Sequence, residues 1–119
     1  MSVRTEVADL VTAGVPADWT VKPFGFIPDK AWPPVVAVQQ TAVTPRARFS
    51  QRTVRVLVTL MLEGDAPDKV EDALEAALDV LLAALDPLSG AIGEADRVTV
   101  ADRFHAYQVT VEVTANLET

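Results

Sequence analysis

Alternating hydrophobic and polar residues in the middle of the chain predict a long strand. Every second position from 54 to 62 is apolar: Val54, Val56, Val58, Leu60 and Leu62. Successive side chains of a strand point to opposite faces of a sheet, so this row predicts a strand with one buried face.

The spacing of the apolar residues changes after residues 63–67 and predicts a helix. Apolar side chains then recur every three or four positions, at Val70, Leu74, Ala77, Leu78, Leu81 and Leu85. Residues at this spacing lie on one side of a helix. We expect a central helix of about 18 residues that ends near Asp86 and Pro87, because proline cannot continue a helix. The strand and the helix can then bury their apolar sides against each other.

Shorter elements precede the long strand. Residues 2–13 predict a first helix, with apolar residues at Val3, Val7, Leu10 and Val11 and a left-handed stop at Gly14. Residues 19–22 predict a short strand. Residues 35–44 predict a longer strand, and its first four residues are all apolar, which is typical of a strand buried on both faces.

The remaining pattern completes an α+β fold. Residues 44–53 predict a protruding hairpin with an arginine-bearing tip, and residues 96–104 and 105–115 predict two further strands after the helix. The order is helix, three strands, helix, two strands. It predicts one domain over residues 1–119, with a mostly antiparallel sheet. The long central helix and the short N-terminal helix are expected to pack on one face of that sheet.

Charge is unevenly distributed along this chain of 119 residues, whose net charge is −7. Four of the ten basic residues fall within a short segment: Arg46, Arg48, Arg52 and Arg55. The central helix is acidic and carries Asp72, Glu75 and Asp79. These charges form either two solvated surfaces or complementary surfaces through which copies of the chain meet. The negative balance disfavours nucleic acid as a general partner.

An apolar segment lies between the two predicted strands at residues 19–22 and 35–44. Phe24, Phe26 and Trp32 are too apolar to lie loose on the surface of a monomer. They are expected either to pack over one end of the core or to contact another subunit, where exposed aromatic residues serve as anchors.

No pattern of residues in the chain indicates a reaction. His105 is the one histidine, and a single imidazole without a fixed acidic partner in sequence is expected to be structural. Spacings typical of zinc sites, nucleophile elbows and phosphate-binding glycine loops are absent from the sequence, as is cysteine. No apolar run reaches the ~20 residues that cross a bilayer. We therefore expect no catalytic, metal-binding or cofactor-binding residues, and no membrane association.

Several segments together resemble the tail terminator family of long-tailed phages, especially the versions from phages of actinobacteria. These are the short N-terminal helix, Trp32-Pro33-Pro34-Val35-Val36, the hairpin through residues 46–55, the Ala/Leu/Asp helix over residues 70–79 and the closing strand over residues 104–111. The likeness lies in order, length and composition and covers nearly the whole chain.

This resemblance implies a structural protein that forms a ring of six and caps the finished tail tube. Its partners would be other copies of itself, the tail tube protein below and a head–tail stopper above, with DNA passing through the lumen. It would be located in the virion neck, and in the host cytoplasm during assembly. The arginines of residues 46–55 and the acidic residues of the central helix would then be subunit or lumen contacts.

Two other functions fit the same sequence. One is a different ring protein of the neck, such as a head–tail stopper or a completion protein. The other is a small bacterial ligand-binding domain with a pocket beneath Trp19, Phe24 and Trp32. The first rival shares the ring architecture, whereas the second would remain a monomer or a dimer.

Overall fold

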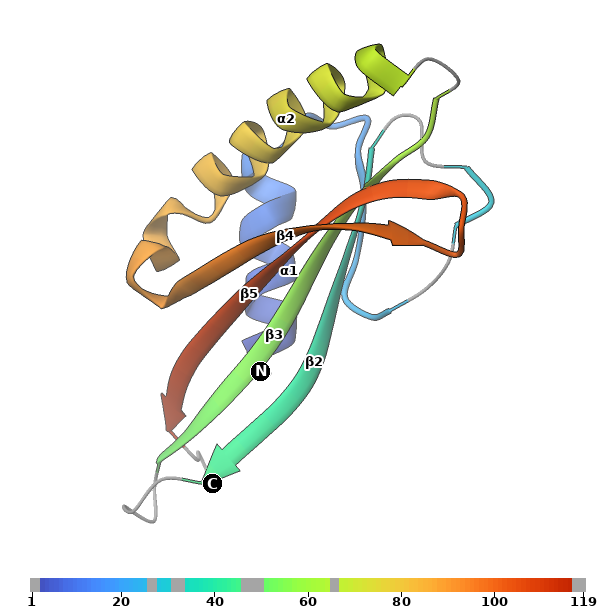
Figure 1. Cartoon of the computed structure of the whole chain (residues 1–119). Helices are drawn as coiled ribbons and strands as arrows, with labels where there is room; N and C mark the ends of the chain where they lie inside the picture. The colour runs from blue at the N-terminus through green and yellow to red at the C-terminus, as the bar shows by residue number, and fades with distance from the viewer. Residues whose placement is uncertain (1–2, 26–27, 31–33, 46–50, 65–66, 117–119) are drawn as a thin grey trace.

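The predicted long strand lies at the centre of the sheet, and both helices pack against it (Figure 1). The computed structural model describes residues 3–25, 28–30, 34–45, 51–64 and 67–116. The elements, in chain order, are α1 (Val3–Gly14), β1 (Thr20–Lys22), β2 (Val35–Pro45), β3 (Gln51–Leu62), α2 (Pro67–Ala84), the 3-10 helix η1 (Asp86–Ala91), β4 (Ile92–Val100) and β5 (Phe104–Asn116). The predicted α+β class and element order are confirmed. The 18 residues of α2 match the expected length, which is within the usual range for globular helices and not especially long.

The sheet has the strand order β1-β2-β3-β5-β4. All neighbouring strands are antiparallel except β1, which runs parallel to β2 over three residue pairs. β3 therefore pairs with β2 on one side and with β5, from much later in the chain, on the other. The long-range pairing of β3 with β5 holds the two halves of the sequence together.

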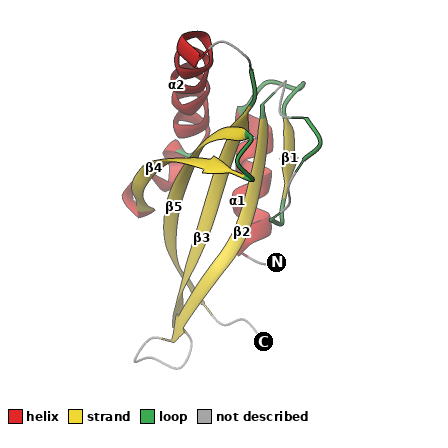
Figure 2. Cartoon of the chain, turned by 45° about the vertical axis from the view of Figure 1, so that its right-hand side comes forward, coloured by secondary structure: helices red, strands yellow, loops and turns green. Residues whose placement is uncertain are grey.

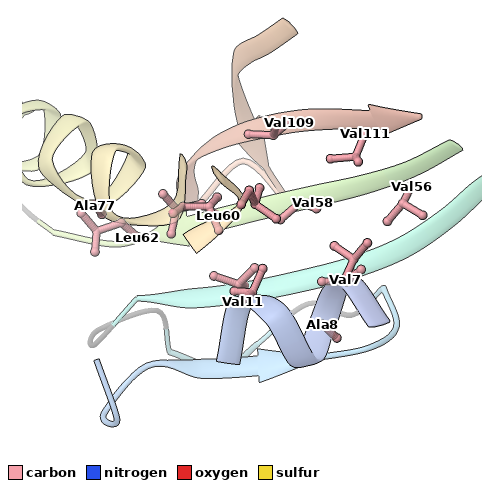
Figure 3. Packing of buried hydrophobic residues seen from close by; sticks show 14 of the residues in the cluster. Val7, Ala8, Val11, Val56, Val58, Leu60, Leu62, Ala77, Val109 and Val111 are labelled. Carbon is pink, nitrogen blue, oxygen red and sulfur yellow. The ribbon is translucent and has the colours of Figure 1, made fainter. Parts of the chain in front are cut away.

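The main core lies between the sheet and the two helices (Figure 3). The even-numbered side chains of β3 from Val54 to Leu62 are all buried there, as the alternation predicts. α1 contributes Val7 and Val11, and α2 contributes the buried residues of its predicted stripe. Leu78 is the exception in that stripe, because it is only partly buried.

The opposite side of the sheet, which we call the outer face, carries a smaller core. Val35 and Ala37 of β2 are buried there with Met61, Phe104 and Ala106. Their neighbours Val36 and Val38 point into the main core. The prediction that this strand begins buried on both faces is thus confirmed.

The first helix extends over Val3–Gly14, and the predicted left-handed stop at Gly14 is wrong. No described glycine has a positive φ, and Val15 N still donates to Val11 O at 3.0 Å as in a helix. Gly14 instead allows α1 to approach α2, because a Cβ at this position would lie 2.5 Å from Ala84 Cβ. Close helix packing, and not a left-handed backbone, requires the glycine.

The predicted strand over residues 96–104 is also misplaced. β4 covers Ile92–Val100, and a turn follows in which Ala101 and Asp102 have φ values of 55° and 54°. An irregularity between Ile92 and Ala95 disturbs the alternation at the start of β4. Alanine gives no sequence signal for a left-handed turn, for which glycine and asparagine are the usual markers. Asp102 is a residue type that accepts this backbone, but without a glycine or asparagine beside it the sequence does not place the turn.

Three strands continue past the helices and make the molecule elongated, with extents of 51, 26 and 23 Å. We call this extension the tongue: residues 42–45 of β2, 51–55 of β3 and 112–116 of β5 (Figure 2). β1 reaches only Ala37 of β2, and the pairing of β4 with β5 ends at Val111. The described ends of the predicted hairpin lie in this tongue, whereas residues 46–50 lie outside the described residues.

Candidate interaction surfaces

Arg97 of β4 joins the edge of the sheet to α2. Its Nη2 donates to Glu71 Oε1 at 2.6 Å and lies 2.8 Å from His105 Nδ1. A guanidinium can only donate, so Nδ1 of His105 accepts in this arrangement. The hydrogen bond from Arg97 holds the pKa of Glu71 below its ordinary value. The one histidine is therefore part of a polar contact that fastens β4 to the helix.

Arg103, on the turn between β4 and β5, also joins segments that are distant in the sequence. Its Nη2 donates to the carbonyl oxygen of Asp29 and lies 3.5 Å from Glu63 Oε2. The guanidinium also lies over the Phe104 ring, 4.7 Å from its centroid. These contacts attach the turn to the segment before β2. The sequence gives no signal for these partners of Arg103, because they come from distant parts of the chain.

The arginine cluster expected from the sequence is divided between two faces of the sheet. Arg55 lies on the outer face, where its Nη2 is 2.8 Å from Glu112 Oε1 and both side chains are about half exposed. Arg52 lies on the helix side, partly buried, and its Nε has no hydrogen-bond partner among the described residues. Arg46 and Arg48 lie outside the described residues. The two described arginines therefore do not form one continuous basic surface.

The acidic residues of α2 are exposed together on the side turned away from the sheet. Asp72, Glu75 and Asp79 recur at three- and four-residue spacing, and each is exposed. The helix lies at the end of the molecule opposite the tip of the tongue (Figure 1). The structure thus presents an acidic helix surface that is separate from the arginines of β3.

The predicted aromatic surface is described only at Phe24. This side chain is 50% exposed, whereas Phe26 and Trp32 lie outside the described residues. Trp19, also named for a possible ligand pocket, is partly buried against the main core. Of the three residues expected to line a ligand pocket, Trp19 and Phe24 are described and Trp32 lies outside the described residues.

Trp19 does line a different hollow, of about 510 Å³, between α2 and the segment that leads into β1. Its walls are mostly small and apolar, and they consist of Pro16, Asp18, Trp19, Pro34, Ala73, Ala76, Ala77 and Val80. Among the described residues that line it, Asp18 is the one that carries a charge. A second hollow of about 350 Å³ lies on the outer face beside Met61 and Gln108.

The described residues contain no group of three or more His, Asp or Glu side chains placed to hold a metal ion. Within the same residues, no helix combines the length and apolar character needed to cross a membrane.

Comparison with known proteins does not assign this chain to a family. The chain matches no protein-family model, and no curated protein matches it.

Proposed function

We propose that this protein is a structural virion protein of the tail terminator type, which forms a ring of six at the end of a phage tail tube. In this role it caps the tube and offers a docking surface to the head–tail stopper. DNA passes through the lumen, and no cofactor takes part. The tail terminator type is proposed from the resemblance of the sequence, and the elongated shape of the chain supports the proposed ring.

The observation that carries the proposal is the tongue, whose outer strands β2 and β5 have no second strand neighbour there among the described residues. A neighbouring subunit would cover these open edges. The acidic side of α2 provides a second, chemically different surface at the other end of the molecule. A ring in which subunits meet head to tail needs two different surfaces on every copy.

Sedimentation velocity over a concentration series, followed by negative-stain imaging, tests this proposal. We expect rings with six-fold symmetry at high protein concentration. A variant with Asp72→Lys, Glu75→Lys and Asp79→Lys should assemble less well if the acidic surface is a subunit contact. The single change Glu75→Lys is compared with Asp9→Lys as a control for added positive charge, because each adds the same charge and Asp9 is exposed on the other helix. A wild-type chain that stays monomeric at every concentration would contradict the proposal.

A ligand-binding domain remains the second candidate, because the hollow beside Trp19 has the size of a small-molecule site. Tryptophan fluorescence during titration with small aromatic and aliphatic acids and amides would detect such a ligand. Saturable binding that is removed by Ala76→Leu, at an exposed position that lines the hollow, in a chain that forms no rings, would favour this function over the ring. An unchanged spectrum across the set would count against it.

A further inference from the structure

The tongue has an open edge on each side. On the β2 side, no described strand pairs with the chain beyond Ala37. On the β5 side, the last pair with β4 is Ile92–Val111. Residues 112–116 therefore have no second strand neighbour in the described chain. Open strand edges present rows of backbone N–H and C=O groups, which favour pairing with another strand.

The two open edges lie at the same position along the direction of the strands. Thr44 of β2 pairs with Thr53 of β3, and Thr53 pairs in turn with Thr114 of β5. β2 and β5 also run in the same direction, because both are antiparallel to β3. Consider two copies that are related by a rotation about an axis parallel to the strands. The β5 edge of one copy then faces the β2 edge of the next, and no translation along the axis is needed to align them. Pairing without such a translation closes a ring, whereas a translation would build a helical filament.

A row of valines gives an independent indication of the same contact. Val43, Val54 and Val113 are paired across the three strands of the tongue and therefore lie on the same face. Val54, in the middle, is buried, whereas Val43 is 44% exposed and Val113 is only partly buried. Val43 and Phe24 are the two large hydrophobic residues exposed in the described chain. Joining β2 to the β5 of a neighbour would place Val43 beside the neighbour's Val113 and continue the row.

The composition of the β2 edge is consistent with pairing. Residues 39–44 are Gln, Gln, Thr, Ala, Val and Thr, with no charge. Natural proteins commonly protect exposed edge strands with lysine or with bulges. An irregularity does lie between Gln40 and Ala42, but the pairing with β3 is regular again from Ala42 onward. Residues 42–44 of this edge are therefore regular and uncharged, whereas Pro45, at its end, has no N–H to donate and marks the limit of the pairing.

We propose that β2 of one copy pairs in parallel with β5 of the next copy, so that the sheets of the ring join edge to edge through their tongues. This inference rests on the proposed ring and specifies which surfaces form it. The partner is a second copy of the same chain, and the contact is heterologous, since β2 meets β5 and never another β2.

Charge changes at Thr44 and Thr114 test this pairing. Both side chains are exposed, so that the folded monomer should tolerate substitution. A Thr44→Lys, Thr114→Lys variant places like charges at every joint, and we expect ring assembly to weaken by about tenfold or more. A Thr44→Lys, Thr114→Glu variant places opposite charges at every β2–β5 joint and should restore assembly. In a symmetric β2–β2 or β5–β5 dimer, the same variant would bring like charges together and restore nothing.

Sedimentation velocity provides the readout, and circular dichroism melting verifies that each variant is folded. An Ala13→Lys, Ala83→Lys variant is a matched control, because it adds the same charge at exposed helix positions. Hydrogen exchange provides a second measurement. Amides of residues 42–44 and 112–116 should exchange more slowly in wild-type rings than in the double-lysine monomer.

The outcomes separate this inference from the proposed function. Wild-type rings together with undiminished assembly of the double-lysine variant would overturn the edge pairing and leave the ring intact. Failure of the lysine–glutamate variant to recover would also overturn it. A wild-type chain that forms no rings would overturn both proposals.

Discussion

Replacing Leu81 with alanine tests whether the apolar stripe of α2 holds the domain together. Leu81 is fully buried in the main core, between the helix and the sheet. The substitution removes three carbon groups, each of which contributes about 0.8 kcal/mol on burial. It also leaves a cavity, and comparable changes in protein cores lower the free energy of unfolding by about 2–5 kcal/mol. A domain of this size has about 5–15 kcal/mol in total, so the loss is a large fraction.

Urea denaturation followed by circular dichroism measures this effect. We expect the Leu81→Ala midpoint to fall by about 1–3 M relative to wild type. Leu78→Ala is the matched control, because Leu78 lies on the same helix and is only partly buried. Its midpoint should move by less than half as much. Equal shifts in the two variants would refute the packing of this helix against the sheet, as would a Leu81→Ala shift within experimental error.

Three further substitutions probe separate features of the fold. Ala101→Gly should raise the free energy of unfolding, measured by urea titration, by about 0.5–1 kcal/mol. Glycine removes the strain of the left-handed backbone at this position, at some entropic cost. An unchanged or lower free energy of unfolding would contradict this. Gly14→Ala should lower the melting temperature and reduce the free energy of unfolding by about 1–3 kcal/mol, because the added Cβ collides with Ala84. A melting temperature equal to that of wild type would show that the two helices separate easily. The lowered pKa of Glu71 means that its contact with Arg97 stabilises the fold above the ordinary carboxyl pKa, and that this contribution is lost as the pH falls through the lowered value. Melting curves between about pH 3 and pH 6 should therefore fall less steeply on the acid side for Glu71→Gln than for wild type, and parallel curves would oppose this assignment.

The sequence predicts those parts of the fold that depend on regular alternation. The period-two row of β3 is buried where the pattern places it, and so is the helical stripe of α2 except for Leu78, which is partly buried. Such patterns are reliable because a shift of one residue would turn the whole apolar row toward water. Val35 and Val36 likewise show that a continuous apolar run indicates a strand covered on both sides.

The misplaced features depend on contacts between distant segments. The sequence predicts a local stop at Gly14, but the role of this glycine is set by Ala84, which lies at the end of the other helix. The turn at Ala101 lacks a local signal, and Arg97 gives no indication in sequence that Glu71 lies opposite. The open edges of the tongue also depend on how far β1 and β4 extend along their neighbours. Periodicity carries no information about strand pairing of this kind.

The central place of β3 has a consequence for how a newly made copy matures. β3 can pair with β2 as soon as both have left the ribosome, because the two are consecutive in the chain. Its other partner, β5, is synthesised only after α2 and β4. A copy released too early would thus lack one side of the tongue and could not accept a neighbour there. Under the proposed pairing of β2 with the β5 of a neighbour, the order of translation would therefore exclude unfinished chains from the ring.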